Sequence, residues 1–298
     1  MRKTIYLLSF IALLLYSKII QSQFLPFYEN KNSSNALLMM NLKGKVKSIQ
    51  QISYKAMDNG GVIQKGEKGS LSDQSSVNSD FSMQFDDTAR TVKEVFYNVK
   101  DLTINHRYDD TKNIEIVEQS ESSGKVFFKN TYKYNDRGKV IEETMTQIFK
   151  DNVSFDNKFI LKYDEKGNLI EKSYYSSRYK DESKSIYTYD SKGKLISKAD
   201  YNEKNILWNK ETYKVDTKGN IIERNYYKPD CVAIAHTFIL KYDSNNNVIQ
   251  KEYYQPAGKL SKTYSYKYEY DKTGNWVKRI DFENGKATFI LERQLEYY

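Results

Sequence analysis

A segment of about 27 residues recurs through the second half of the chain, and this repeat constrains the fold more than any other feature of the sequence. Each copy is anchored on one turn residue, and successive anchors lie 26 to 29 residues apart. The anchors are Gly138, Gly167, Gly193, Gly219, Asn246 and Gly274. Such regular spacing is typical of folds in which one small structural unit stacks on the next.

The anchor residues have a simple backbone explanation. An Asp three positions before the anchor can accept hydrogen bonds from backbone amides that follow it, which favours a type I turn. Gly then supplies the left-handed conformation that closes a hairpin, and Asn246 is the side chain that best tolerates this conformation after Gly. The predicted structural turn residues are Asp164, Gly167, Asp190, Gly193, Asp216, Gly219, Asp243, Asn246, Asp271 and Gly274.

The segments on both sides of each turn have the two-residue period of strands. Apolar and polar residues alternate before the turn, as in Phe159, Leu161 and Tyr163, and an aliphatic pair, charged residues and a Tyr-Tyr pair follow it. This pattern accounts for most of the 27 Tyr residues and predicts antiparallel hairpins. The expected fold is all-β: a repetitive antiparallel hairpin meander of ~27-residue units that forms one elongated, twisted or coiling sheet.

The start of the chain has the three parts of a secretory signal over residues 1–22. Arg2 and Lys3 precede an apolar run, and a polar exit ends at Ser22. The run is shorter than the roughly 20 apolar residues that span a bilayer, and no Cys lies near the exit for acylation. The sequence predicts an exported protein that has no membrane span after cleavage and is not a lipoprotein. We expect it in the periplasm or outside the cell, with association with the outer surface as one alternative.

The rest of the chain divides by the quality of the repeat. Residues 23–127 contain degenerate copies and a polar segment near 66–80 that we expect to be a mobile insertion, and residues 128–298 contain the regular copies. No linker separates the two parts, so we expect them to be continuous.

The turn motif resembles the YD (Rhs-type) repeat family. Its Tyr-x-Tyr-Asp lead-in occurs as Tyr187-Thr188-Tyr189-Asp190 and Tyr268-Glu269-Tyr270-Asp271. The resemblance implies hairpin strips or shells at a bacterial surface, sometimes linked to carbohydrate binding. Pieces such as Asn284-Gly285-Lys286 also bear a weaker likeness to MORN-like repeats.

Several kinds of site are unsupported by the sequence. One Cys and two His leave little for disulfides or a zinc site, and the catalytic and phosphate-binding motifs are missing. Each turn offers a single Asp, whereas calcium needs six to eight oxygens. The 47 basic and 39 acidic residues are interspersed, which argues against nucleic acid. We expect no catalytic residue, metal or cofactor, with Cys231 an incidental buried thiol.

Two columns of residues are candidates for binding. The second Tyr of each pair presents an aromatic face that can stack on a sugar ring or pack across strands. These candidate carbohydrate-binding residues are Tyr175, Tyr201, Tyr227 and Tyr254. A basic column five residues after each turn anchor suits an anionic polysaccharide or a salt-bridged face. Its members are Lys172, Lys198, Arg224, Lys251 and Arg279.

The sequence thus predicts an exported, non-enzymatic β-repeat protein of the envelope or extracellular space that binds a polysaccharide or an envelope protein. Two alternatives stay open. One is a secreted glycan-processing enzyme with unidentified carboxylates, and the other is a purely structural shell fragment of an Rhs-type system.

Overall fold

The described part of the chain consists almost entirely of β-strands. The structure is a computed structural model that describes residues 40–69, 80–97, 102–149, 152–177, 182–228 and 230–298. The predicted signal segment lies outside these residues, as do residues 70–79 of the predicted insertion, whereas Gly66–Lys68 belongs to a strand. In the described ranges, no helix is long and apolar enough to cross a membrane.

The described residues form nineteen strands in chain order. The first nine are β1 (Val46–Asn59), β2 (Val62–Lys68), β3 (Phe81–Phe85), β4 (Thr91–Phe96), β5 (Leu102–Asp109), β6 (Ile114–Ser120), β7 (Val126–Tyr134), β8 (Val140–Phe149) and β9 (Asn152–Tyr163). The next five are β10 (Leu169–Ser176), β11 (Glu182–Tyr189), β12 (Leu195–Tyr201), β13 (Leu207–Val215) and β14 (Ile221–Tyr227). The last five are β15 (Ile234–Tyr242), β16 (Val248–Gln255), β17 (Lys259–Tyr270), β18 (Trp276–Glu283) and β19 (Lys286–Tyr297). From β3 onward each strand pairs antiparallel with the next, which confirms the all-β antiparallel prediction.

The turn between β13 and β14 illustrates how the repeat motif closes a hairpin. The Asp216 N–H donates to the Asn220 carbonyl at 2.9 Å, and the Gly219 N–H donates back to the Asp216 carbonyl at 3.3 Å. Asp216 Oδ1 also accepts from the Lys218 N–H at 2.8 Å. Gly219 has a φ of +94°, and Asn246 at the equivalent position has a φ of +64°. The motif therefore places its left-handed residue where the chain must reverse.

A β-bulge after each turn explains the aliphatic pair. In β10 the register shifts between Leu169 and Glu171, so Ile170 has no partner of its own. Leu169 is 4 % exposed, whereas Ile170 is 37 % exposed. The first aliphatic residue thus packs in the core and the second lies on the opposite face.

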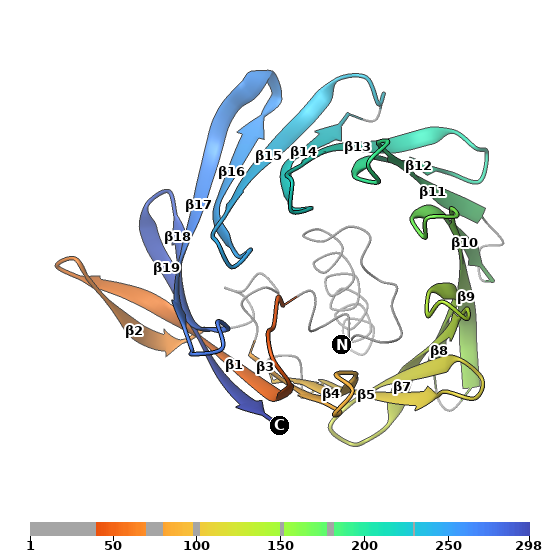
Figure 1. The fold of residues 1–298 in the computed structure, drawn as a ribbon, viewed down its shortest axis with the longest axis horizontal. Coiled ribbons are helices and arrows are strands. Elements are labelled where there is room, and N and C mark those ends of the chain that lie inside the picture. Colours follow the sequence, from red (N-terminus) through yellow and green to blue (C-terminus); the bar gives the residue numbers. More distant parts are fainter. Residues whose placement is uncertain (1–39, 70–79, 98–101, 150–151, 178–181, 229) are drawn as a thin grey trace.

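The sheet closes on itself, which corrects the predicted open, coiling meander. β1 pairs antiparallel with β19 from Val46↔Tyr297 to Lys55↔Phe289, and the first part of β1 also pairs with β3. β2 pairs only with β1, so the ring holds 18 of the 19 strands (19 − 1). Figure 1 shows this ring, with β19 beside β1. Closure satisfies the hydrogen-bonding groups that two free edge strands would expose.

Alternate side chains lie on opposite faces of the barrel wall. In β13, Glu211 and Tyr213 are each 5 % exposed, whereas Lys214, between Tyr213 and the turn, is exposed. Side chains converge on the concave face of a barrel and diverge on its convex face. We therefore assign the more buried set to the inner face and the alternate set to the outer face.

Two apolar clusters form the core of the wall. The first lies on β1 and β3–β6 and consists of Val46, Ile49, Phe81, Met83, Phe85, Phe96, Ile104 and Val117. The second belongs to the regular repeats and consists of Tyr134, Val140, Leu161, Leu169, Tyr187, Leu195 and Tyr213. The Tyr before each turn also ties neighbouring repeats together. For example, Tyr189 Oη donates to the Leu169 carbonyl at 2.9 Å, and Tyr242 Oη donates to the Ile221 carbonyl at 2.8 Å.

Candidate functional site

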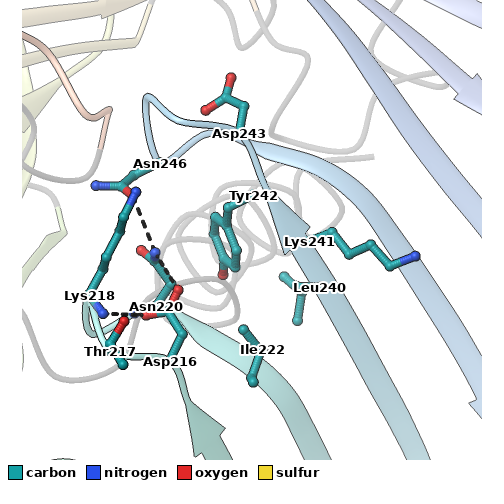
Figure 2. A pocket seen from close by; sticks show the side chains of 10 residues that line it. All are labelled: Asp216, Thr217, Lys218, Asn220, Ile222, Leu240, Lys241, Tyr242, Asp243 and Asn246. Atoms are coloured by element: carbon teal, nitrogen blue, oxygen red, sulfur yellow. Dashed lines mark hydrogen bonds between the residues drawn. The ribbon is translucent and has the colours of Figure 1, made fainter.

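The predicted turn residues lie along one rim of the barrel. A pocket of about 330 Å³ lies between two successive turns, and Figure 2 shows the side chains around it. Asn220 bridges the turns by donating from Nδ2 to Asn246 Oδ1 at 3.3 Å and to Asp216 Oδ2 at 3.0 Å. Hydrogen bonds from Asn220 hold the pKa of the Asp216 carboxyl below its usual range, although partial burial opposes this. The polar groups of the pocket therefore serve the turns themselves.

The four Tyr residues proposed for carbohydrate binding lie on the outer face, near the opposite rim. Tyr175 is 37 % exposed. Lysines on the preceding strands lie over two of the other rings, with Lys184 Nζ 5.7 Å from the centre of Tyr201 and Lys210 Nζ 4.8 Å from the centre of Tyr227. One strand separates each Tyr of the row from the next, so the rings lie roughly 10 Å apart. They form a spaced row and not a joined surface.

The inner face of β14–β17 holds a continuous aromatic surface, which we call the inner aromatic wall. Tyr226 stacks on His236 with ring centres 4.4 Å apart, and His236 lies 5.6 Å from Tyr253. Phe238 lies 5.1 Å from Tyr253, so the four rings form one series of contacts. Tyr264 on β17, opposite Lys251 on β16, continues the wall. Each of these side chains is partly exposed.

Basic side chains lie over the rings of the wall. The Arg224 guanidinium is 4.5 Å from the centre of Tyr226, and its Nε donates to Glu211 Oε2 at 2.6 Å. Lys251 Nζ is 4.4 Å from the centre of Phe238. Burial, and then the nearby Arg224 charge, lower the pKa of His236 and leave its imidazole neutral near pH 7. The wall thus combines aromatic faces with fixed positive charge.

A second polar cluster lies on the inner face of β4–β6. His106 Nε2 contacts Glu94 Oε1 at 2.9 Å and His106 Nδ1 contacts Glu115 Oε1 at 2.8 Å, and Tyr134 donates to the other oxygen of Glu115. Burial disfavours the imidazolium, but the hydrogen bonds that His106 donates to Glu115 and Glu94 outweigh it and raise the pKa of His106 to about 9. His106, on β5 of the barrel, therefore carries a positive charge at neutral pH.

Metal and nucleophile sites are not formed by the described residues. Nowhere in ranges 40–69, 80–97, 102–149, 152–177, 182–228 and 230–298 do three or more His, Cys, Asp or Glu side chains gather as ligands for an ion. Cys231 is a buried thiol outside any disulfide, in the turn that follows β14, and its backbone N–H donates to the Lys228 carbonyl at 2.7 Å.

The sequence analysis singled out one Tyr of each pair and missed the other. Tyr226 and Tyr253 precede the predicted Tyr227 and Tyr254, and adjacent strand residues point to opposite faces. The Tyr-Tyr pair is thus a signal for two rows. Which row faces inward depends on the direction in which the sheet curves, and local sequence does not determine that direction.

Comparisons with known proteins give only distant likenesses. No family model matches the chain, and no curated protein matches it. A porin-like protein from Bacteroides uniformis is 12 % identical, with a TM-score of 0.42 over 85 % of this chain and 98 % of that one. A porin-like protein from Bacteroides vulgatus is 14 % identical, with a TM-score of 0.40 over the same shares. A chain of the Photorhabdus luminescens Tc holotoxin pore is 10 % identical, with a TM-score of 0.24 over 74 % of this chain and 16 % of that one. At such values the likenesses establish neither a shared fold nor a shared function.

Proposed function

We propose that the protein is an exported, non-enzymatic barrel of the cell envelope that binds a carbohydrate against its inner aromatic wall. The observation that carries this proposal is the unbroken contact of Tyr226, His236, Phe238 and Tyr253 on the inner face. Barrels of roughly 16–18 strands leave an aqueous interior. Side chains on the inner face of an 18-strand ring therefore line a space and do not fill it.

Aromatic faces in a concave site with a few polar groups are typical of ligand-binding surfaces. The apolar faces of sugar rings stack on such aromatics, while hydroxyl groups need polar partners. Arg224 and Lys251 provide polar donors beside the rings. The inner wall supports this function better than the outer Tyr row, whose rings lie farther apart.

The state of the inner carboxylates supports a binding role over hydrolysis. Cleavage of glycosidic bonds uses one carboxylic acid that keeps its proton and a second carboxylate beside it. Glu211 contacts Arg224 at 2.6 Å, and Asp281 contacts Arg279 at 2.6 Å. Each of these two carboxylates is thus held by a guanidinium, whereas hydrolysis needs a carboxylic acid that is free to reach the glycosidic oxygen.

The outer face supports a location in an aqueous compartment of the envelope. It carries ion pairs such as Lys162–Glu171 at 2.8 Å and Lys214–Glu223 at 2.7 Å. On a lipid-facing strand a Lys near the bilayer midplane costs about 2–4 kcal/mol. Water is therefore the favoured surrounding of this face.

A glycan array on the purified full-length protein tests the proposal. The matched variants are Tyr253→Ala on the inner face and Tyr254→Ala next to it on the outer face, with equal circular dichroism as the folding control. We expect Tyr253→Ala to weaken binding about fivefold or more, taking the ~1–3 kcal/mol of a nucleobase stacked on an aromatic side chain as the scale for a stacked sugar ring, and Tyr254→Ala to leave it unchanged. Loss of binding with Tyr254→Ala alone would favour the outer Tyr row as the binding site. Release of shortened glycans would favour the alternative of a glycan-processing enzyme. Absence of binding on the array would refute the proposal.

A further inference from the structure

The basic column of the repeats lies on the inner face, and four of its five members are neutralised. The contacts are Lys172–Glu143 at 3.2 Å, Lys198–Asp200 at 2.9 Å, Arg224–Glu211 at 2.6 Å and Arg279–Asp281 at 2.6 Å. Asp200 and Asp281 each lie two residues after their cation on the same strand, whereas Glu143 and Glu211 lie on other strands than theirs. Buried cations need such partners because desolvation of an unpaired charge is expensive.

Lys251 is the exception in the column. Its ammonium contacts rings, 4.4 Å from the centre of Phe238 and 5.9 Å from the centre of Tyr264, and no carboxylate of the described residues pairs with it. Leu240 lies opposite Lys251 on β15, in a position where an acid would neutralise it. Burial and the nearby Arg224 charge lower the pKa of Lys251, which is the effect expected of a cation without an anion beside it.

The charges around Lys251 add up to one uncompensated positive charge. Arg224 and Glu211 cancel each other, and the neutral His236 adds nothing at pH 7. A monoanionic group such as a carboxylate or a sulfate ester balances this site, whereas a phosphate monoester carries about −1.5 to −2 at pH 7. Lysine also suits a single point charge, since it lacks the fork with which Arg binds two oxygens.

We propose that Lys251 is the anion-recognition residue of the inner aromatic wall and that the bound carbohydrate is acidic, with a carboxylate or sulfate next to its ring. This inference rests on the proposed function and names its ligand class. The ring stacks on Phe238 and Tyr253, and the anionic group meets the Lys251 ammonium at the edge of the same surface. The unneutralised cation thus marks the one repeat that is adapted for a ligand.

The test compares ligands that differ only in charge. Isothermal titration calorimetry of the full-length protein uses trigalacturonic acid, its neutral methyl ester and a sulfated trisaccharide. We expect the acid to bind about tenfold or more tightly than its ester, since a charge-assisted hydrogen bond contributes that much. Lys251→Met should remove this advantage without changing the affinity for the ester, and Lys251→Arg should keep it.

Lys241→Met is the matched control, because Lys241 lies on the outer face of the adjacent strand and contacts only Gln250 there, at 3.2 Å. Binding of the sulfated probe that depends on Lys251 would also support the inference. Equal affinity for acid and ester, or an equal loss of both with Lys251→Met, would overturn it and leave the proposed function standing. Failure of all three probes together with an empty glycan array would overturn both.

Discussion

A buried amide, Asn275, links the two ends of the described chain where the barrel closes. The side chain is 1 % exposed. Its Oδ1 accepts from the Lys43 N–H at 2.7 Å, and its Nδ2 donates to the Lys43 carbonyl at 2.8 Å and to Tyr297 Oη at 2.8 Å. The two bonds with Lys43 join the start of the described chain to the turn between β17 and β18, 232 residues away. We predict that Asn275→Ala specifically destabilises the seam between β1 and β19.

The structure gives the size of this effect. Three hydrogen bonds are lost at about 1 kcal/mol each, and the part-buried N–H and C=O of Lys43 lose their Asn275 partner, so the expected cost is about 3–4 kcal/mol. Asn168→Ala is the matched control, since Asn168 occupies the equivalent turn position and its side chain bonds only Asp164, at 2.9 Å. We expect a cost of about 1 kcal/mol there.

Urea denaturation followed by tyrosine fluorescence and circular dichroism measures both free energies of unfolding. Asn275→Asp adds an internal check, because it keeps the acceptor for the Lys43 N–H and loses the two donated bonds. Its cost should be at least half that of Asn275→Ala. If Asn275→Ala and Asn168→Ala cost the same within about 0.5 kcal/mol, the seam contacts do not stabilise the closed barrel and the reasoning is wrong.

Three further predictions concern other parts of the wall. The pKa of His106 is raised, so its charge stabilises the fold fully below pH ~6.5, and this contribution is lost as pH rises through about 9. The difference in urea midpoint between the wild type and His106→Gln should therefore shrink from pH 6 to pH 10. An added Cβ at Gly219 meets no steric obstacle, but the backbone there has a φ of +94°. Thermal unfolding of Gly219→Ala should therefore show a loss of about 1–2 kcal/mol in stability. Asn246→Gly should change stability by less than that. Leu291 is 0 % exposed, and Leu291→Ala should cost about 2–5 kcal/mol in the same assay; a cost below 1 kcal/mol would contradict its place in the core.

Sequence reasoning reached the hairpins because their determinants are local. The bonds that Asp216 makes to Lys218 and Asn220 span four residues at most, and the residue types at these positions report them directly. The bulge at Ile170 was not predicted, although the aliphatic pair that accompanies it breaks the two-residue alternation. Local turn chemistry therefore predicts strand order and pairing through most of the sheet.

The candidate site was harder to predict because its parts meet across strands. Tyr253 and Tyr254 are indistinguishable in the repeat, yet only Tyr253 contacts His236 and Phe238. The basic column was visible as a pattern, but its members differ in whether a carboxylate lies nearby. That difference depends on residues of other strands, such as Glu143 of the preceding repeat for Lys172, and a repeat alignment averages it away.

Closure itself must come from residues that do not repeat. A meander of equivalent hairpins has the same edge after every unit, so the repeat does not determine that the sheet ends at 18 strands. The ends of this chain differ from the repeat. Gln51 on β1 accepts from Arg293 Nε on β19 at 3.0 Å, and Ser48 Oγ donates to Glu296 at 3.0 Å. These pairs, with Asn275, make the facing edges of β1 and β19 complementary to each other. Local hairpins form before contacts of such long sequence separation. The number of repeats therefore sets how far the sheet can curve, and the two unlike edge strands determine that the ring closes where they meet.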